Sequence, residues 1–250
     1  MKVHPLECGR LTAPLELMEE GKSGGTNMPV MAFLLVHPDG RMALFDAGLV
    51  PEMDGTVASG AFHMFLPPGH DVASRLRAMD VDPGRVDRLV VSHSHFDHIA
   101  GAALVPNAEL VIHQAELDAA LQTSTKGYAR RTLDLGHARR TTGDSFDLFG
   151  DGSAEVFATP GHTCGHQSLR IRRRSGWDVL AGDACYFCVT LSEEGVQPYA
   201  HDKAVYLSSL RRLKQMALDG DLIVPGHDLG FMDRLPADTT LQAPATAATG

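Results

Sequence analysis

The chain has 250 residues, of which 44% are hydrophobic, so it is long enough to bury one sizeable core. Its formal net charge of −9 disfavours nucleic acid as the main partner, because phosphate binding needs clustered Lys and Arg. The start has no apolar leader, no run is long enough to span a membrane, and the four Cys do not suggest a disulfide framework, so we expect a cytoplasmic protein.

The first elements along the chain are short apolar runs separated by turn residues. Residues 31–36 and 42–45 are expected to be strands, joined by a hairpin turn at 37–40. Residues 49–70 are expected to form a loop, whose apolar stretch 62–66 could line a pocket, belong to the core or form an interface. The pocket candidates are Met28, Phe62, Met64, Phe65 and Leu66.

Strand and helix patterns then alternate. Asp71 is expected to begin a helix that stops near Pro83, and residues 122–147 read as polar and irregular. A single hydrolase domain is expected over 1–235, and the tail 236–250, rich in Ala, Thr and Pro, is expected to be disordered. Further strands are expected at 89–91, 110–112, 155–158, 168–172, 178–181 and 222–224, and further helices at 114–121 and 202–218.

The most informative stretch packs three imidazoles and a carboxylate into six residues, directly after the strand at 89–91. His93 and His95 are two residues apart, so their side chains point the same way on an extended chain. Asp97 and His98 follow where the chain turns, and can face a second point in space. Such groups are hard to bury without polar partners, so the cluster predicts two neighbouring metal ions.

Other short strands also end in residues that bind metals, namely His162, Asp183 and His227. Loops held at strand ends by a rigid sheet commonly carry enzymatic sites. The strands fall into two groups with helices after each, which predicts an α/β protein with two facing sheets and helices outside. The sequence contains neither a P-loop nor a Rossmann glycine fingerprint.

The cluster at 93–98 and the later motifs ending in His162, Asp183 and His227 resemble, in order and spacing, the metallo-β-lactamase superfamily across about residues 30–230. The resemblance implies an αββα four-layer sandwich with two divalent metal ions, usually zinc, although iron, manganese or cobalt suit the same donor atoms. It implies that metal one is held by His93, His95 and His162, that metal two is held by Asp97, His98 and His227, and that Asp183 bridges both.

Other polar residues near these motifs receive supporting roles. Asp46 resembles the family's carboxylate that orients a ligand imidazole. His166 is interpreted as a structural residue or a partner of a ligand. Cys185 and Cys188 form a single C-x-x-C, which is a weak metal signal, and both are interpreted as buried thiols.

The segment from Gly182 to Tyr186 is similar to the Asp-Ala-x-Tyr motif of the N-acyl homoserine lactone lactonases, whereas the commonest zinc β-lactamases carry Cys at the position of Asp183. The likeness implies a quorum-quenching hydrolase that opens a small-molecule lactone by attack of a metal-bridging hydroxide. In this scheme Tyr186 donates to the carbonyl oxygen, and Asp97 or Asp183 passes a proton to the leaving alkoxide.

Two alternatives stay open. The chain could be another hydrolase of the same fold, acting on a different lactone, a thioester, an aryl ester or a phosphate ester. It could also be a non-catalytic metal protein, although a structural site would close its coordination with four ligands per ion. The sequence leaves open whether the protein is a homodimer.

Overall fold

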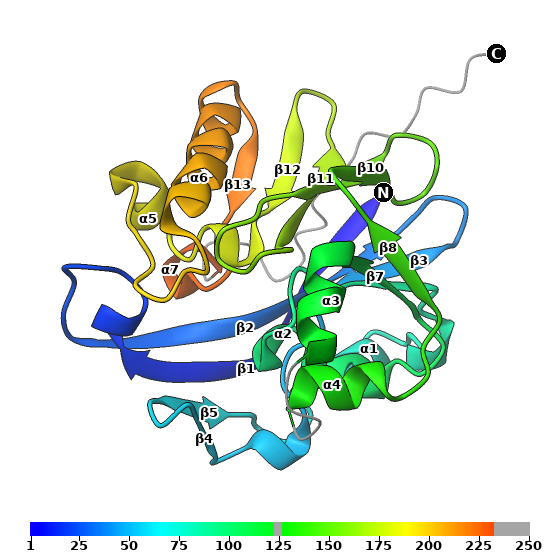
Figure 1. Cartoon of the computed structure of the whole chain (residues 1–250). Coiled ribbons are helices and arrows are strands. Elements are labelled where there is room, and N and C mark those ends of the chain that lie inside the picture. Colours follow the sequence, from blue (N-terminus) through cyan, green and yellow to red (C-terminus); the bar gives the residue numbers. More distant parts are fainter. Residues whose placement is uncertain (123–126, 233–250) are drawn as a thin grey trace.

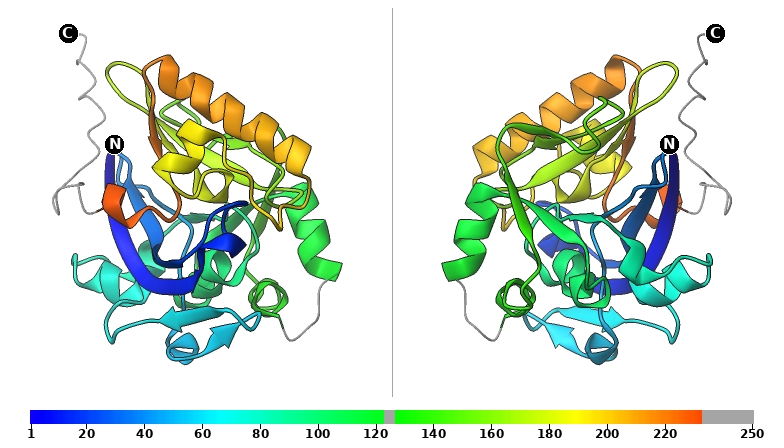
Figure 2. Two further views of the ribbon diagram at one scale, coloured as in Figure 1. Left: turned by 90° about the vertical axis from the view of Figure 1, so that its left-hand side faces the viewer. Right: turned by 90° about the vertical axis from the view of Figure 1, so that its right-hand side faces the viewer.

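Two β-sheets lie face to face at the centre of the protein, with helices on both outer sides (Figures 1 and 2). The computed structural model describes residues 1–122 and 127–232. The tail expected to be disordered, 236–250, lies outside the described residues.

The first sheet joins an N-terminal hairpin to a parallel half. Its eight strands in the described part of the chain are, in spatial order, β4 (Val57–Ala58), β5 (Phe62–Phe65), β1 (Lys2–Pro14), β2 (Gly25–Val36), β3 (Met42–Phe45), β6 (Arg88–Val90), β7 (Glu109–His113) and β8 (Arg139–Thr142). Strands β1, β2 and β3 pair antiparallel, and β3, β6, β7 and β8 pair parallel.

The second sheet is smaller and is antiparallel except for its last pair, β12 with β13. Within residues 1–122 and 127–232 its five strands are β13 (Leu222–Val224), β12 (Trp177–Leu180), β11 (Gln167–Arg172), β10 (Ala154–Ala158) and β9 (Ser145–Asp147). The α-helices are α1 (Val72–Arg77), α2 (Phe96–Ile99), α3 (Gln114–Gln122), α4 (Tyr128–Leu133), α5 (Cys188–Glu193), α6 (Lys203–Leu218) and α7 (Leu229–Met232). Among the described residues no helix combines the length and the apolar character needed to cross a bilayer.

Alternating side chains separate the two faces of the first sheet, as a period of two requires. Leu34 and Leu89 pack in one cluster with residues of α1, α3 and α4. Leu35 and Val90, one residue further along each strand, pack instead against the second sheet. The far face of the second sheet is covered by α6, whose Tyr206 is fully buried there (Figure 1). The predicted αββα sandwich is therefore confirmed.

The N-terminal strand was not predicted, and β2 begins at Gly25 rather than at residue 31. The register of β1 against β2 shifts between Glu7 and Arg10, and Gly9 within the shift has φ 122°. A bulge of this kind breaks the alternation of polar and apolar residues that identifies a strand. The expected helices begin where predicted, because Asp71 and Asp202 cap α1 and α6 by accepting backbone N–H hydrogen bonds, but α1 ends at Arg77 rather than near Pro83.

Two stretches expected to be irregular contain regular structure. The loop over 49–70 includes β4 and β5, with β5 paired to β1. The stretch 122–147 includes α4, β8 and β9, and its residues 123–126 lie outside the described residues. The strands among these elements are short, and pairing with neighbouring strands, rather than their own pattern, fixes them.

Candidate metal and active site

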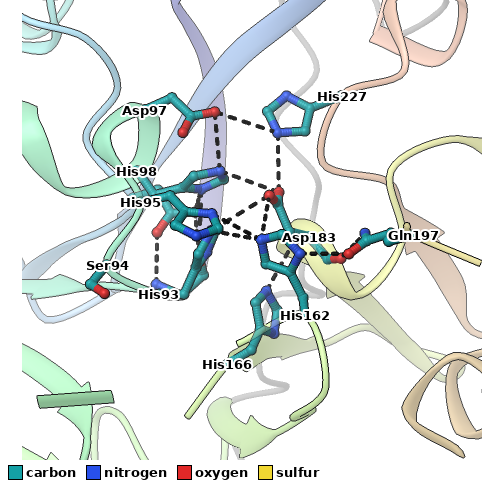
Figure 3. A network of polar contacts seen from close by, with 12 residues as sticks. His93, Ser94, His95, Asp97, His98, His162, His166, Asp183, Gln197 and His227 are labelled. Carbon is teal, nitrogen blue, oxygen red and sulfur yellow. Dashed lines mark hydrogen bonds and ion pairs between the residues drawn. The ribbon is translucent and has the colours of Figure 1, made fainter. Parts of the chain in front are cut away.

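The residues expected to bind metal come together at one end of the two sheets. His93 follows β6, and Asp97 and His98 lie in the short helix α2 just beyond it. From the second sheet, His162 follows β10 and His227 follows β13. The remaining two members, His95 and Asp183, precede α2 and follow β12 respectively (Figure 3).

Two groups of donor atoms are present, and within each group the atoms lie within 4.8 Å of one another. In the first, His162 Nε2 lies 3.2 Å from His93 Nε2 and 3.0 Å from His95 Nδ1. In the second, His98 Nε2 lies 3.5 Å from Asp97 Oδ2, and His227 Nε2 lies 3.8 Å from the same oxygen. The division into two sets agrees with the division predicted from sequence.

Asp183 lies between the groups and turns one oxygen to each. Its Oδ2 lies 3.2 Å from His162 Nε2 and 3.5 Å from His93 Nε2. Its Oδ1 lies 3.0 Å from His227 Nε2 and 3.2 Å from His98 Nε2. A carboxylate in this position can bind two ions at once, as expected for a bridging ligand.

Outer partners fix the tautomer of most of these imidazoles. His98 Nδ1–H donates to Asp46 Oδ2 at 2.8 Å, and His227 Nδ1–H donates to the carbonyl of Pro29 at 2.9 Å. His162 Nδ1–H donates to Oε1 of Gln197. The Nε2 of Gln197 donates in turn to the backbone carbonyl of Asp183. In the neutral form of each ring, Nε2 thus carries a lone pair directed into the site, and this is the form that binds a metal.

The same holds for His93. Ser92 Oγ donates to Asp46 Oδ2 at 2.8 Å, so it accepts the Nδ1–H of His93 at 3.0 Å. The lone pairs of His93 Nε2 and His162 Nε2 therefore face each other at 3.2 Å without a proton between them. Such an arrangement is repulsive by itself and is relieved by a bound cation. On the other side, the buried His98 Nε2 and Asp183 Oδ1 lack hydrogen-bond partners among the described residues. The residues present therefore fit metal ions.

Charge is unevenly distributed between the groups. Burial, helped by the neighbouring His98, lowers the pKa of His93 well below its usual value, so this imidazole is neutral. Burial also opposes a charge on His98, but the carboxylates of Asp183, Asp97 and Asp46 outweigh it and raise its pKa well above the usual range. The pKa of His227 is raised in the same way, with Asp183 as the main carboxylate. The second group is thus the one that attracts positive charge most strongly.

His166 is not positioned as a ligand. Its Nε2 accepts the backbone N–H of Asp183 at 3.0 Å, and its Nδ1–H donates to Thr159 Oγ1 at 2.9 Å. Both ring nitrogens are therefore engaged, and the ring holds the backbone of Asp183. This confirms the interpretation of His166 as a partner of a ligand. The role expected for Asp46 is likewise supported by its contact with His98.

Tyr186 lies over the ligand groups, with its ring centre 5.7 Å from that of His162 and 5.5 Å from that of His227. Burial raises the pKa of Tyr186 well above its usual value, so its hydroxyl is protonated and can donate.

The interpretation of Cys185 and Cys188 as buried thiols was wrong for one of them: Cys185 is buried, but Cys188 is exposed. The buried Cys185 donates to the carbonyl of Phe187 and does not belong to either donor group.

A cavity of about 570 Å³ opens above the ligand groups. Of the pocket candidates, Met28 and Phe62 line it, whereas Met64 and Leu66 are buried in the core and Phe65 is 56% exposed. Its further apolar lining is Leu11, Leu17, Met18, Ala61, Phe96, Tyr186 and Tyr199. A mainly apolar cavity ending at polar groups is typical of a small-molecule site.

Sequence reasoning missed two buried polar residues of this region, Gln197 and Glu116. Gln197 belongs to a loop with no motif of its own, and its contacts are with residues far away in the sequence. Glu116 lies beside Leu117 and four residues before Ala120, on the buried side of α3. An acid on the apolar side of a helix was the signal that could have identified it.

The fold and the paired donor groups define a family. The model of the metallo-beta-lactamase superfamily matches residues 25–227, and the chain therefore belongs to this superfamily. Among curated relatives, the N-acyl homoserine lactonase AttM of Azorhizobium caulinodans is 26% identical over 246 residues, which cover 91% of this chain and 93% of the relative. The N-acyl homoserine lactonase of Bacillus cereus is 30% identical over 214 residues, covering 81% and 82% of the two chains.

Solved structures share the fold. A B. thuringiensis AiiA variant with N-decanoyl-L-homoserine bound at its active site gives a TM-score of 0.82 at 23% identity, covering 93% of this chain and 95% of that chain. An N-acyl homoserine lactone hydrolase with the product N-hexanoyl-L-homoserine at its catalytic metal centre gives a TM-score of 0.81 at 24% identity, with the same coverage.

Proposed function

We propose that this protein is a metal-dependent hydrolase that opens the lactone ring of N-acyl homoserine lactones, and thereby quenches quorum signals. The observation that carries the proposal is the convergence of two donor groups on Asp183 at the base of an apolar cavity. The full-length relatives named above are lactonases of this substrate class, which supports the same assignment.

In the proposed site, two divalent ions would be held by separate sets of side chains. His93, His95 and His162 would hold the first, Asp97, His98 and His227 would hold the second, and Asp183 would contribute to both. Nitrogen and carboxylate donors suit zinc, which we propose as the native ion, and they would also accept iron, manganese or cobalt. When bound, such ions polarise a carbonyl group and lower the pKa of bound water to about 7.

The chain's own residues then orient and stabilise the reacting groups. The neutral hydroxyl of Tyr186 donates a hydrogen bond to the oxyanion that develops on the lactone carbonyl. Asp97 is buried at the base of the cavity and takes up the proton that the water molecule loses as it adds to the carbonyl carbon. It passes this proton to the leaving alkoxide, with Asp183 as the other candidate for the transfer. Gln197 keeps His162 in the tautomer that the site needs.

The apolar lining accounts for the acyl chain of the substrate. The aliphatic side chains of Leu17, Met18 and Met28 and the ring of Phe62 surround the cavity beside the ligand groups. A hydrocarbon chain gains about 0.8 kcal/mol for each methylene that it buries. The cavity therefore favours an acylated lactone over a bare γ-lactone.

We place the protein in the cytoplasm, as the sequence led us to expect.

Proton release during hydrolysis tests the proposal. The zinc-loaded enzyme is offered hexanoyl and decanoyl homoserine lactones, simple γ-lactones and an aryl ester, with Asp118→Asn as a matched control because Asp118 is an exposed carboxylate of α3. We expect rapid opening of the homoserine lactones by the wild type and the control, and none by Asp97→Asn. Cleavage of the ester alone would assign the protein to another hydrolase branch of the family.

A further inference from the structure

Glu116 is a buried carboxylate that the reaction outlined above does not use. It lies in the first turn of α3, is only 1% exposed, and forms no ion pair within residues 1–122 and 127–232. A buried charge without a counter-ion is costly unless hydrogen bonds satisfy it. Its surroundings must therefore supply donors, and both loops that carry the first ligand group do so.

One oxygen of Glu116 holds the loop of His93 and His95. Its Oε1 accepts the backbone N–H of Ser94 at 2.9 Å and the hydroxyl of Ser94 at 2.5 Å. Ser94 is the residue between the two ligand histidines, so a shift of Ser94 moves both imidazoles. Hydrogen bonds to an ionised acceptor are shorter and stronger than neutral ones, which makes this an effective restraint.

The other oxygen holds the loop of His162. Oε2 of Glu116 accepts the backbone N–H of Gly165 at 3.2 Å. This loop lies directly on α3, since a Cβ atom added to Gly165 would come within 2.2 Å of the backbone nitrogen of Glu116 and 2.6 Å of its Cβ. The carboxylate thus joins two loops that come from different sheets.

We infer that Glu116 is a positioning residue for the first metal ion, because it fixes the spacing between the His93–His95 loop and the His162 loop. Asp46 has the corresponding place behind the second group, where it holds His98. The inference rests on the metal site proposed above. It adds that a buried carboxylate lies behind each set of ligands, although Asp46 also reaches His93 of the first set through Ser92. Loss of Glu116 should therefore weaken one ion and spare the other.

Glu116→Gln tests this with almost no change in size. Whichever way the amide is turned, its NH₂ group faces a backbone N–H, of either Ser94 or Gly165, so one loop loses its acceptor. Changes in residues behind metal ligands typically lower metal affinity about 10- to 100-fold. We expect a loss of this size for the first ion, and less than a twofold change for the second. Asp118→Asn, on the same helix, is the matched control and should bind both ions as the wild type does.

The measurement is titration of the metal-free protein with Co²⁺, following its visible absorption, together with competition against a chelating dye for Zn²⁺. His95→Ala and His227→Ala identify the spectral components of the first and the second group. Glu116→Gln should lose the component that His95→Ala loses. The melting temperature of the metal-free form monitors folding, and Ser94→Ala, which removes only one of the three hydrogen bonds, gives an intermediate case should Glu116→Gln fold poorly.

Three results would contradict the inference. Unchanged affinity for both ions in Glu116→Gln would show that the carboxylate does not position the first group. An equal loss of both ions would show a general structural role instead. If the wild type bound no ion, the proposed metal site would be wrong, and the inference about Glu116 would be wrong with it. If the wild type bound two ions, the metal site would stand, and the result for Glu116→Gln would test the inference by itself.

Discussion

Asp46→Asn should weaken the second metal ion without unfolding the protein. Asp46 Oδ2 accepts from His98 Nδ1–H and from Ser92 Oγ, and Oδ1 accepts the backbone N–H of Ser92 at 2.7 Å. An asparagine cannot keep all three acceptor positions, and its NH₂ group favours the wrong tautomer of His98, with a hydrogen on the ring nitrogen that should bind metal. Asparagine is preferable to alanine because residue 46 has φ 59°, a conformation that asparagine tolerates.

The size of the effect follows from the hydrogen bond that is lost. A hydrogen bond to a charged group contributes about 1.5–3 kcal/mol, which corresponds to about a 10- to 150-fold change in a dissociation constant at 25 °C. We therefore expect the second ion to dissociate 10- to 150-fold more readily, and turnover to fall at limiting metal but to recover with excess metal. The first ion should be weakened much less, because Asp46 reaches its ligand His93 only through Ser92.

The assay is a competition titration with a chelating dye, followed by lactone hydrolysis at limiting and at excess zinc, with Asp118→Asn as the control for loss of an exposed charge. Two tightly bound ions in Asp46→Asn, with turnover independent of added zinc, would refute the reasoning. So would a loss confined to the first ion, because Asp46 contacts only the second group's His98 among the ligands.

Three further predictions follow from the site. Tyr186→Phe should lower kcat about 10²- to 10³-fold with unchanged metal content, measured by steady-state kinetics and elemental analysis, and a loss of metal would contradict its role as an oxyanion donor. Phe62→Ala should raise KM for the decanoyl substrate about fivefold, as the loss of apolar contact area predicts, and for the hexanoyl substrate less. Equal effects on both substrates would show that the acyl chain does not contact Phe62. The pKa values of His98 and His227 are raised without metal, so the second ion must displace protons when it binds. Its affinity should therefore increase with pH until those pKa values are passed. Metal titrations at several pH values test this, and an equal pH response of both ions would disprove it.

The members of the two donor groups could be predicted because each belongs to a short motif next to an apolar strand. The residues behind them could not, since Glu116 and Gln197 are single polar residues whose partners lie far away in the sequence. Their roles arise only when the loops of two sheets meet. Strand β1 was missed for a local reason, the bulge at Gly9, which offsets the alternation of polar and apolar residues along this strand.

The aliphatic residues around the cavity come from a different part of the chain than the metal ligands. Leu11, Leu17, Met18, Met28 and Ala61 all precede residue 66, whereas the ligands all lie between His93 and His227. Substitutions of these five lining residues can therefore reshape what the protein accepts while the reaction chemistry stays intact. In evolution, such a separation allows the range of signals that the enzyme destroys to change in small steps, each of which leaves a working catalyst.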